Sequence, residues 1–397
     1  MDAANDAIAT AALGLQPQTV ELRRRIHRHP EIGLDLPHTQ AVILSALEGL
    51  GYRVTTGSGC SSVVATLEED QGPTVILRAD MDALPLAEET GLSFSSGIEG
   101  AMHACGHDTH VAMLLGAARI LSERRSELAG RVVLMFQPGE EGFAGAQVML
   151  DEGILEPVLP DAAFALHVIT YWPAGRILTR PGAMLASADV FRVVVRGRGG
   201  HASSPHLALD PIPALLEIGT ALQTMVTRRV SVFDPAVVTV AHVDAGTTTN
   251  VIPETAMLEG TVRTLSADVR EAVLGQIRVV AEGVAAAHGV AAEVAIEPGY
   301  PPTLNDAGMA ARAIEVASGL VGADRAEIMD EPVMGAEDFS YVLEQVPGAM
   351  VFLSAGDPDA YEPVPNHSNR MIVHEPVMAD GVALYAALAM SVVGKDR

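Results

Sequence analysis

The sequence predicts an α/β protein in which a smaller domain interrupts a larger one. Near both ends of the chain, continuous apolar runs of strand length alternate with segments of helical periodicity, as in α/β proteins whose strands are covered on both faces. The middle of the chain instead shows the order β-α-β-β-α-β, which is the split ferredoxin-like unit. We therefore expect a larger domain formed by residues 1–184 and 299–397, and an inserted domain at residues 185–298.

The elements of the larger domain are expected from about residue 17 onward. Uninterrupted apolar runs predict buried strands at 74–78, 131–137 and 162–168. Helical periodicity predicts helices between them at 107–124 and 144–152. The same alternation returns near the C-terminus, where we expect a helix at 308–321, a strand at 349–354 and a helix at 376–393.

The elements of the inserted domain are predicted by a change of pattern. Strands are expected at 189–197, 236–245, 254–264 and 291–299. The helix expected at 210–226 has prolines in its first turn, and the helix expected at 266–289 begins at a capping serine and ends at a glycine.

The composition limits the class of protein. A chain of 397 residues is longer than one ordinary core, so two domains are expected, and 49% hydrophobic against 19% charged residues indicates a globular protein. The 25 basic and 50 acidic residues give a net charge of −25. Such a chain would be repelled by phosphate backbones and anionic lipids, so nucleic acid and membranes are not expected as partners.

The N-terminus, the apolar runs and the few cysteines and lysines argue against secreted, membrane-spanning, Schiff-base and P-loop proteins. The N-terminus lacks a basic signal-peptide region, no apolar run approaches membrane length, and Cys60 and Cys105 form no disulfide framework, so we expect a cytoplasmic protein with reduced thiols. Lys395, near the C-terminal end, is the only lysine. Schiff-base enzymes and P-loop NTPases need a positioned lysine and are therefore not expected.

Polar clusters follow several of the predicted strands. They are RADMDALP (78–85), HACGHD (103–108), QPGEEG (137–142), LHV (166–168) and PNHSN (365–369). Open α/β sheets build their sites at the carboxyl ends of strands. Any one of these residues alone is more often structural than functional, but their recurrence at strand ends predicts a shared site.

The stretch HACGHDTH (103–110) allows two interpretations. His103, His107 and His110 could share one helical face, but Gly106 interrupts it and the glutamate of an HExxH zinc motif is absent. We favour Cys105 and His107 as a pair on an irregular helix entry, with His103 and His110 in supporting or structural positions. Cys60 is expected to be a small structural residue.

The motifs together resemble those of a known family. RADMDALP, HACGHDTH, PGEEG, LHV, GRGGHAS, TTTNVIPETAMLEGTVRT, GAEDFS and HS stand in the same order over nearly the whole chain. With them the chain resembles the M20 metallopeptidase family, in the amidohydrolase branch of aminoacylase-, hippurate hydrolase- and auxin-conjugate hydrolase-like enzymes. The resemblance implies a zinc-peptidase-like catalytic domain with a mixed sheet flanked by helices, and a ferredoxin-like lid that mediates dimerisation.

The resemblance also implies roles for individual residues. The implied metal ligands are Cys105, His107, Glu141, His167 and His367, with Cys105 as a bridging thiolate. Asp80 stands where other branches have their first histidine, and His107 is expected to fill that vacancy, while Asp82 matches a carboxylate that supports the ligands. Glu140 matches the general base. In the lid, His201, Asn250 and Arg263 match substrate contacts, with His201 reaching the site of a neighbouring subunit.

These roles agree with the chemistry of amide hydrolysis. Two bridged divalent cations lower the pKa of water from about 15.7 towards 7. Glu140 would take the proton and deliver it to the leaving nitrogen. His201 would stabilise the oxyanion together with a metal ion, and Arg263 would bind a carboxylate through two hydrogen bonds.

The leading hypothesis is a metal-dependent amidohydrolase that cleaves N-acyl-L-amino acids, such as acetyl or benzoyl conjugates. The alternative within the superfamily is a dipeptidase or carboxypeptidase acting on short peptides. A metal-containing binding protein is less favoured because the ligand set and the base are both intact, and a hydrolase with Cys105 as nucleophile is less favoured still.

The expected cofactors are two divalent ions per subunit, zinc, manganese, cobalt or nickel. The expected partners are the small substrate and a second copy of the chain, in a homodimer through the lid or a higher oligomer. After His367 the family often has an aromatic residue and an aspartate, where this chain has Met371 and His374. This departure leaves the acyl preference open.

Overall fold

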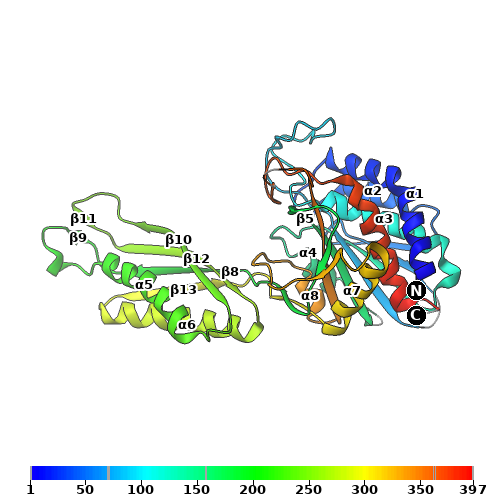
Figure 1. Ribbon diagram of the computed structural model, residues 1–397. Coiled ribbons are helices and arrows are strands. Elements are labelled where there is room, and N and C mark those ends of the chain that lie inside the picture. Colours follow the sequence, from blue (N-terminus) through cyan, green and yellow to red (C-terminus); the bar gives the residue numbers. More distant parts are fainter. Residues whose placement is uncertain (1, 69–71, 157–158, 361, 363, 396–397) are drawn as a thin grey trace. The chain divides into compact units, whose positions relative to one another are not determined.

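The computed structural model describes residues 2–68, 72–156, 159–360, 362 and 364–395. The chain separates into two compact units (Figure 1). Unit 1 comprises residues 1–184, 304–331 and 338–397, and unit 2 comprises residues 185–303 and 332–337. Unit 2 therefore extends past the predicted boundary at residue 298. The segment 332–337 belongs to it because Ala186 N–H donates to the carbonyls of Val333 and Gly335.

Unit 1 is built on an eight-stranded mixed sheet with the order β1-β2-β4-β3-β5-β16-β6-β15. The strands are β1 (Arg53–Thr56), β2 (Val63–Leu67), β3 (Thr74–Asp80), β4 (Arg131–Gln137), β5 (Ala162–Pro173), β6 (Ile177–Thr179), β15 (Ala326–Ile328) and β16 (Gly348–Gly356). β3 pairs parallel with β4 and β5, and β5 pairs parallel with β16. β2 pairs antiparallel with β1 and β4. The expectation of a mixed sheet is confirmed.

Helices cover both faces of this sheet (Figure 1). They are α1 (Asp2–His27), α2 (Pro37–Leu47), α3 (His107–Glu123), α4 (Gly145–Asp151), α7 (Ala307–Val321), α8 (Ser340–Leu343) and α9 (Met378–Val393). Val75 and Leu77 of β3 point into the core formed with α1, α3, α7 and α9, whereas Ile76 points into the smaller core under α4 and α8. The two-sided burial explains why the strand reads as an uninterrupted apolar run.

The observed elements differ from the predicted ones mainly in length. β4 coincides with the predicted strand 131–137, while β5 continues past residue 168 to Pro173. α1 begins at Asp2 rather than near residue 17, and Pro17 lies inside it.

One segment is also more apolar than expected, since Glu375–Val393 is long and apolar enough to cross a membrane, although 78% of that window is buried. Such burial is typical of a core helix.

Unit 2 contains a four-stranded antiparallel sheet with the order β10-β12-β8-β13. Its elements are β8 (Asp189–Arg196), α5 (Pro211–Arg229), β10 (Ala236–Ala245), β12 (Thr255–Thr264), α6 (Ala267–Ala287) and β13 (Ala291–Glu297), with the short strands β9 (Gly200–His201) and β11 (Val251–Ile252) paired separately. Asp210 caps α5 and Ser266 caps α6 through their side-chain oxygens. The main elements follow the order β-α-β-β-α-β.

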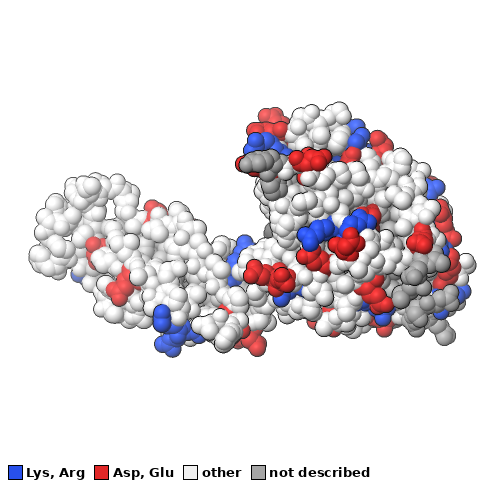
Figure 2. Space-filling model, viewed as in Figure 1, with Lys and Arg blue, Asp and Glu red and all other residues white. Residues whose placement is uncertain are grey.

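The remaining short elements are β7 (Gly182–Leu185), β14 (Thr303–Asn305), η1 (Arg125–Glu127), η2 (Pro205–Leu207) and η3 (Glu375–Val377). β7 and β14 pair with each other where the chain passes between the units. On the face shown in Figure 2, acidic side chains are scattered among basic and uncharged ones. The negative net charge is therefore not gathered into one patch on that face.

A buried imidazole connects α1 to α3 and to the loop before it. His27 Nδ1 lies 2.8 Å from Asp108 Oδ2, and His27 Nε2 lies 3.3 Å from Glu88 Oε1. Arg23 Nε donates to the same Asp108 oxygen at 3.0 Å. Burial acts to lower the pKa of His27, but Asp108 and Glu88 outweigh it and raise that pKa to about 9. His27 is therefore an imidazolium ion at neutral pH.

We predict that His27→Gln destabilises the protein in a pH-dependent way. Because the pKa of His27 is about 9 in the folded chain and about 6.5 in the unfolded chain, its contribution is complete below pH about 6.5 and is lost as the pH rises through about 9. The difference in unfolding free energy between wild type and variant should be on the order of 3 kcal/mol near pH 6 and much smaller near pH 10. Urea unfolding at both pH values measures it, and a difference that stays constant contradicts the assignment.

Candidate metal centre

The ligand-type side chains of unit 1 converge at the carboxyl edge of its sheet. Among the described residues, five groups of ligand atoms have all their members within 4.8 Å of one another: Cys105, His107 and His167; Cys105, Glu141 and His367; His107, Glu140 and Glu141; Asp80, His107 and His110; and Glu140, Glu337 and Asp338. β3, β4 and β5 run parallel, so the segments that follow their carboxyl ends meet at one edge. The five ligands that the sequence predicted are thus brought together, and Cys105 belongs to two of the groups.

Cys105 and His107 flank a turn that only glycine can make. Gly106 is the N-cap of α3 with φ of 90°, in the left-handed region that other residues rarely adopt. A Cβ atom on Gly106 would also lie 2.4 Å from Val168 Cγ2. The turn leaves Cys105 Sγ 3.3 Å from His167 Nε2 and 3.3 Å from His367 Nε2, with Cys105 only 7% exposed.

His107 is fully buried, and neither of its ring nitrogens makes a hydrogen bond. Its Nδ1 lies 3.5 Å from Asp82 and its Nε2 lies 3.5 Å from Asp80. Burial alone would lower the pKa of His107, but the negative charges of Asp80 and Cys105 raise it well above the ordinary value. A buried imidazole without hydrogen bonds is costly unless something else binds it. The donor set of thiol, imidazole and carboxylate therefore fits a divalent cation.

Asp82 positions the two adjacent glutamates. Its carboxylate accepts the backbone N–H of Glu140 at 2.9 Å and that of Glu141 at 3.0 Å. Gly139, with φ of 74°, begins this turn, and a Cβ atom there would lie 2.5 Å from Leu34 Cδ2. Glu141 Oε1 consequently lies 3.2 Å from His367 Nε2. Hydrogen bonds to Cys105 and Glu141 raise the pKa of His367 to about 10, so binding of a cation there would release a proton.

Asp80 and His110 form a fully buried pair beside the ligands. Val168 N–H donates to His110 Nε2 at 2.8 Å, so the proton of the imidazole must be on Nδ1. That nitrogen lies 2.5 Å from Asp80 Oδ1 and donates to it. Both nitrogens of His110 are therefore engaged, which is consistent with a supporting position. His103 is also buried but makes no hydrogen bond, and burial lowers its pKa to about 3.

The sequence did not indicate the side-chain hydrogen bonds that hold the carboxyl edge of this sheet in place. Arg78 is fully buried and donates to Gln137 at the end of β4, to Asp80 at the end of β3 and to the distant Asp338. Asn366, next to His367, donates to the carbonyl oxygen of Cys105. Arg78 lies in RADMDALP and Asn366 in PNHSN, but their partners Asp338 and Cys105 are 260 and 261 positions away.

The other predicted site residues lie in unit 2. His201 of β9 pairs with Val251 of β11, and Asn250 directly precedes β11, where its carbonyl accepts the N–H of Ala202. His201 is exposed, and Ser203 donates its backbone N–H to His201 Nδ1 at 3.2 Å. Arg263 is a half-buried residue of β12. Their roles in binding substrate remain predictions.

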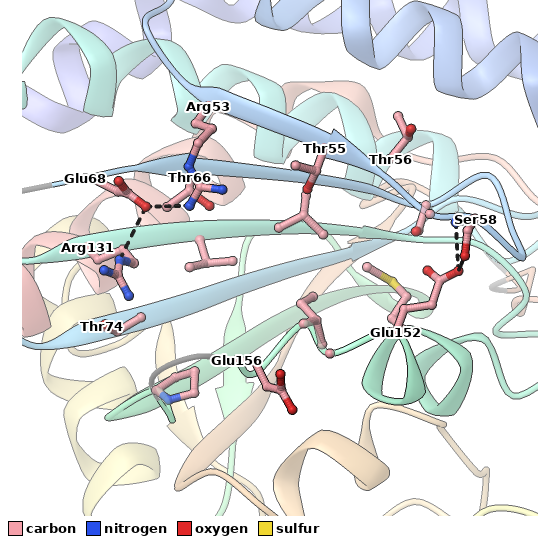
Figure 3. Close-up of a pocket in the computed structure, with 18 residues that line it drawn as sticks. Arg53, Thr55, Thr56, Ser58, Thr66, Glu68, Thr74, Arg131, Glu152 and Glu156 are labelled. Carbon is pink, nitrogen blue, oxygen red and sulfur yellow. Dashed lines mark hydrogen bonds and ion pairs between the residues drawn. The ribbon is translucent and has the colours of Figure 1, made fainter.

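A cavity in unit 1 is lined by none of the predicted site residues. It has a volume of about 420 Å³ and is bordered by β1, β2, β4 and α4 (Figure 3). The hydroxyl-bearing residues Thr55, Thr66 and Thr74 line it, with Arg53 and Arg131 paired to Glu68 at one end. The site residues predicted in unit 1 therefore lie outside this cavity.

Comparison with known proteins identifies relatives along the whole chain. The model of peptidase family M20/M25/M40 matches residues 76–391. The chain is 36% identical to thermostable carboxypeptidase 1 of Saccharolobus solfataricus, covering 95% of each protein. It is 39% identical to IAA-amino acid hydrolase ILR1-like 2 of Arabidopsis thaliana, covering 94% of this chain and 84% of that protein. It is 38% identical to N-acetyl-L-cysteine deacetylase of Bacillus subtilis, covering 88% and 83%.

Two solved structures resemble the chain closely. A protein from methicillin-resistant Staphylococcus aureus has a TM-score of 0.92 at 32% identity, covering 98% of this chain and all of that one. The YXEP protein of Bacillus subtilis, described as a dinuclear metal-binding peptidase, has a TM-score of 0.83 at 34% identity, covering 96% and 99%. The fold described above is therefore the fold of these proteins.

We predict that Cys105→Ala removes more bound metal than His167→Ala or His367→Ala. Cys105 belongs to two ligand groups, whereas His167 and His367 belong to one each. The wild type should bind about two divalent ions per chain, the histidine variants about one, and Cys105→Ala close to none. Elemental analysis after equilibrium dialysis measures this. Cys60→Ala, at the half-buried second cysteine, is the matched control, and undiminished metal in Cys105→Ala would overturn the shared-ligand assignment.

Proposed function

The chain belongs to peptidase family M20/M25/M40, and on that basis we propose that it is a metal-dependent amidohydrolase of N-acyl-L-amino acids. The observation that carries the proposal is the convergence of Cys105, His107, Glu141, His167 and His367 beside a second, adjacent carboxylate, Glu140. Two of the relatives compared above, the IAA-amino acid hydrolase and the N-acetyl-L-cysteine deacetylase, are named for cleaving conjugates of this kind.

The five converging side chains would hold two divalent ions, with the Cys105 thiolate shared between them. When bound, the ions supply positive charge that acidifies water and polarises the amide carbonyl. The chain's own contribution is to hold the ligands in place before binding. His167 does so by donating its Nδ1–H to the carbonyl of Val168 at 2.8 Å, which leaves the Nε2 lone pair directed at Cys105 Sγ.

Glu140 would act as general base and then as general acid. Its backbone is held by Asp82, and its carboxylate is within 4.8 Å of ligand atoms of His107 and Glu141, with the residue 7% exposed. A buried carboxylate beside the reacting water can accept its proton and deliver it to the leaving nitrogen. Two neighbouring glutamates in one turn thus take different roles, one binding metal and one transferring the proton.

Residues of unit 2 would bind the rest of the substrate. Since Ser203 donates to His201 Nδ1, the neutral imidazole carries its proton on Nε2, where it can donate to a developing oxyanion. Arg263 would bind the carboxylate of the amino acid through two hydrogen bonds, which a lysine cannot match. Asn250, beside His201, would contact the same substrate.

A carboxypeptidase is the second candidate. The thermostable carboxypeptidase 1 of Saccharolobus solfataricus is 36% identical over 95% of the chain. A C-terminal residue of a peptide carries the same free carboxylate that Arg263 would bind, so the two candidates differ only in the group on the other side of the amide.

The cytoplasmic location of the protein remains a prediction, and so does the identity of the metal, which is expected to be zinc, manganese, cobalt or nickel.

We predict that Glu140→Gln lowers kcat by about 10²–10⁴-fold without reducing bound metal, because the amide cannot accept the proton. The measurement is hydrolysis of N-acetyl- and N-benzoyl-amino acids by metal-reconstituted protein, beside elemental analysis of the same samples. Glu99→Gln, at an exposed glutamate, is the control and should retain wild-type rates.

The same assay decides between the two candidates. Values of kcat/KM on N-acyl amino acids should exceed those on dipeptides and longer peptides of the same C-terminal residue. Faster cleavage of peptides assigns a carboxypeptidase instead. Hydrolysis that persists in Glu140→Gln removes the proposed mechanism.

We further propose that the chain forms a homodimer through unit 2. β10 is an edge strand of the sheet in the described part of unit 2, and Val243 of β10 and Leu216 of α5, 52% and 62% exposed, border one apolar groove. An exposed edge strand with apolar neighbours favours pairing with another copy.

We predict that Leu216→Glu with Val243→Glu converts the dimer into a monomer, because two charges would be desolvated at the interface. Sedimentation analysis measures the mass. Val279→Glu, at a 61% exposed valine of α6, is the control and should remain dimeric. A monomeric wild type contradicts the proposal.

A further inference from the structure

The side chain of Asn366 connects three segments that carry ligands. Its Nδ2 donates to the carbonyl of Cys105 at 3.0 Å and to the carbonyl of Val168 at 3.0 Å. Its Oδ1 accepts the backbone N–H of Thr170 at 3.0 Å and lies 3.2 Å from the hydroxyl oxygen of Thr170. We propose that Asn366 is a positioning residue that holds the Cys105 turn, β5 and the His367 loop in their metal-binding arrangement before any ion arrives.

The hydrogen bonds determine the orientation of the amide. The backbone N–H of Thr170 can only donate, so the oxygen of Asn366 must face it and the nitrogen must face the two carbonyls. Both hydrogens of the amide are then in use, and its oxygen accepts from Thr170 N–H. An aspartate would place an oxygen against two carbonyl oxygens, and a leucine would make none of these bonds, so the position requires an amide.

The two hydrogen bonds that Asn366 donates both help to orient a ligand. The Val168 carbonyl that accepts from Asn366 also accepts the Nδ1–H of His167, which directs His167 Nε2 at Cys105 Sγ. The Cys105 carbonyl that accepts from Asn366 belongs to the shared ligand itself. Asn366 therefore orients Cys105 and His167 through their backbones although it is not a ligand.

The third ligand is held by the neighbouring backbone. His367 has φ of 66°, a left-handed conformation that costs a non-glycine residue about 1 kcal/mol. Its N–H donates to the carbonyl of Ala104 at 2.7 Å, and Thr170 Oγ1 donates to Val364 at 2.8 Å. The loop has no regular secondary structure from Val364 to Asn369, so these contacts and those of Asn366 keep its strained histidine beside Cys105.

Because Asn366 fixes the loop before an ion binds, the loop should not have to be ordered on binding. Ordering a free loop opposes binding through the loss of conformational entropy, and a loop already fixed removes that cost. Residues that orient ligands typically change metal affinity by about 10–100-fold. This inference rests on the proposed metal centre, but it concerns affinity and not catalysis.

The test measures metal affinity in the absence of substrate. Asn366→Leu should weaken the binding of cobalt(II), titrated into metal-free protein, by about 10–100-fold for the tighter ion, with a weaker near-ultraviolet thiolate-to-cobalt band at equal metal. Thr170→Val, which removes only the hydroxyl bonds, should weaken it by less, about 5-fold. Asn369→Leu, at the other asparagine of the same loop, is the control and should bind as the wild type.

The outcomes are distinguishable. Wild-type affinity in Asn366→Leu, with a lowered urea midpoint of the metal-free protein, would mean that the residue only stabilises the fold and would overturn the inference. If Asn366→Leu does not fold, the affinity of Thr170→Val decides. Failure of the wild type itself to bind cobalt would instead refute the metal centre, and activity without bound metal would refute the proposed function.

Discussion

The arrangement of the metal centre depends on one buried guanidinium. Arg78 connects the ends of β3 and β4 to the segment that begins α8, through Asp80, Gln137 and Asp338. Without its positive charge, Asp80 and Asp338 would each lose one partner of a buried ion pair, a loss that typically costs several kcal/mol. Because Asp80 also accepts from His110, the effect of Arg78 extends to the backbone of β5 and so to His167.

The fold was predictable wherever burial left a strong pattern. The predicted bounds of β4, 131–137, are the observed ones because its apolar run is covered on both faces. β1, in contrast, is mostly exposed and has no apolar run, and β6 and β15 have three residues each, too few to establish a period. Their places in the sheet are determined by pairing with distant strands, which no local pattern records.

The site was predictable as far as its ligand types recurred at strand ends and matched a known order of motifs. The hydrogen bonds that hold those ligands were not predictable in the same way. Asn366 and Cys105 are 261 positions apart, and Arg78 and Asp338 are 260 apart, so no spacing in the sequence connects them. The hydrogen bond that Val168 N–H donates to His110 likewise comes from another strand, so HACGHDTH alone does not record it.

The burial of Cys105 has a practical side. With 7% of that residue exposed and Cys60 half-buried outside the cluster, maleimide reagents should find a single accessible thiol in the native state. Side-chain amines are similarly few, since Lys395 is the one lysine. The protein is therefore suited to oriented attachment on a surface, or to carrying one fluorophore, without first removing native residues.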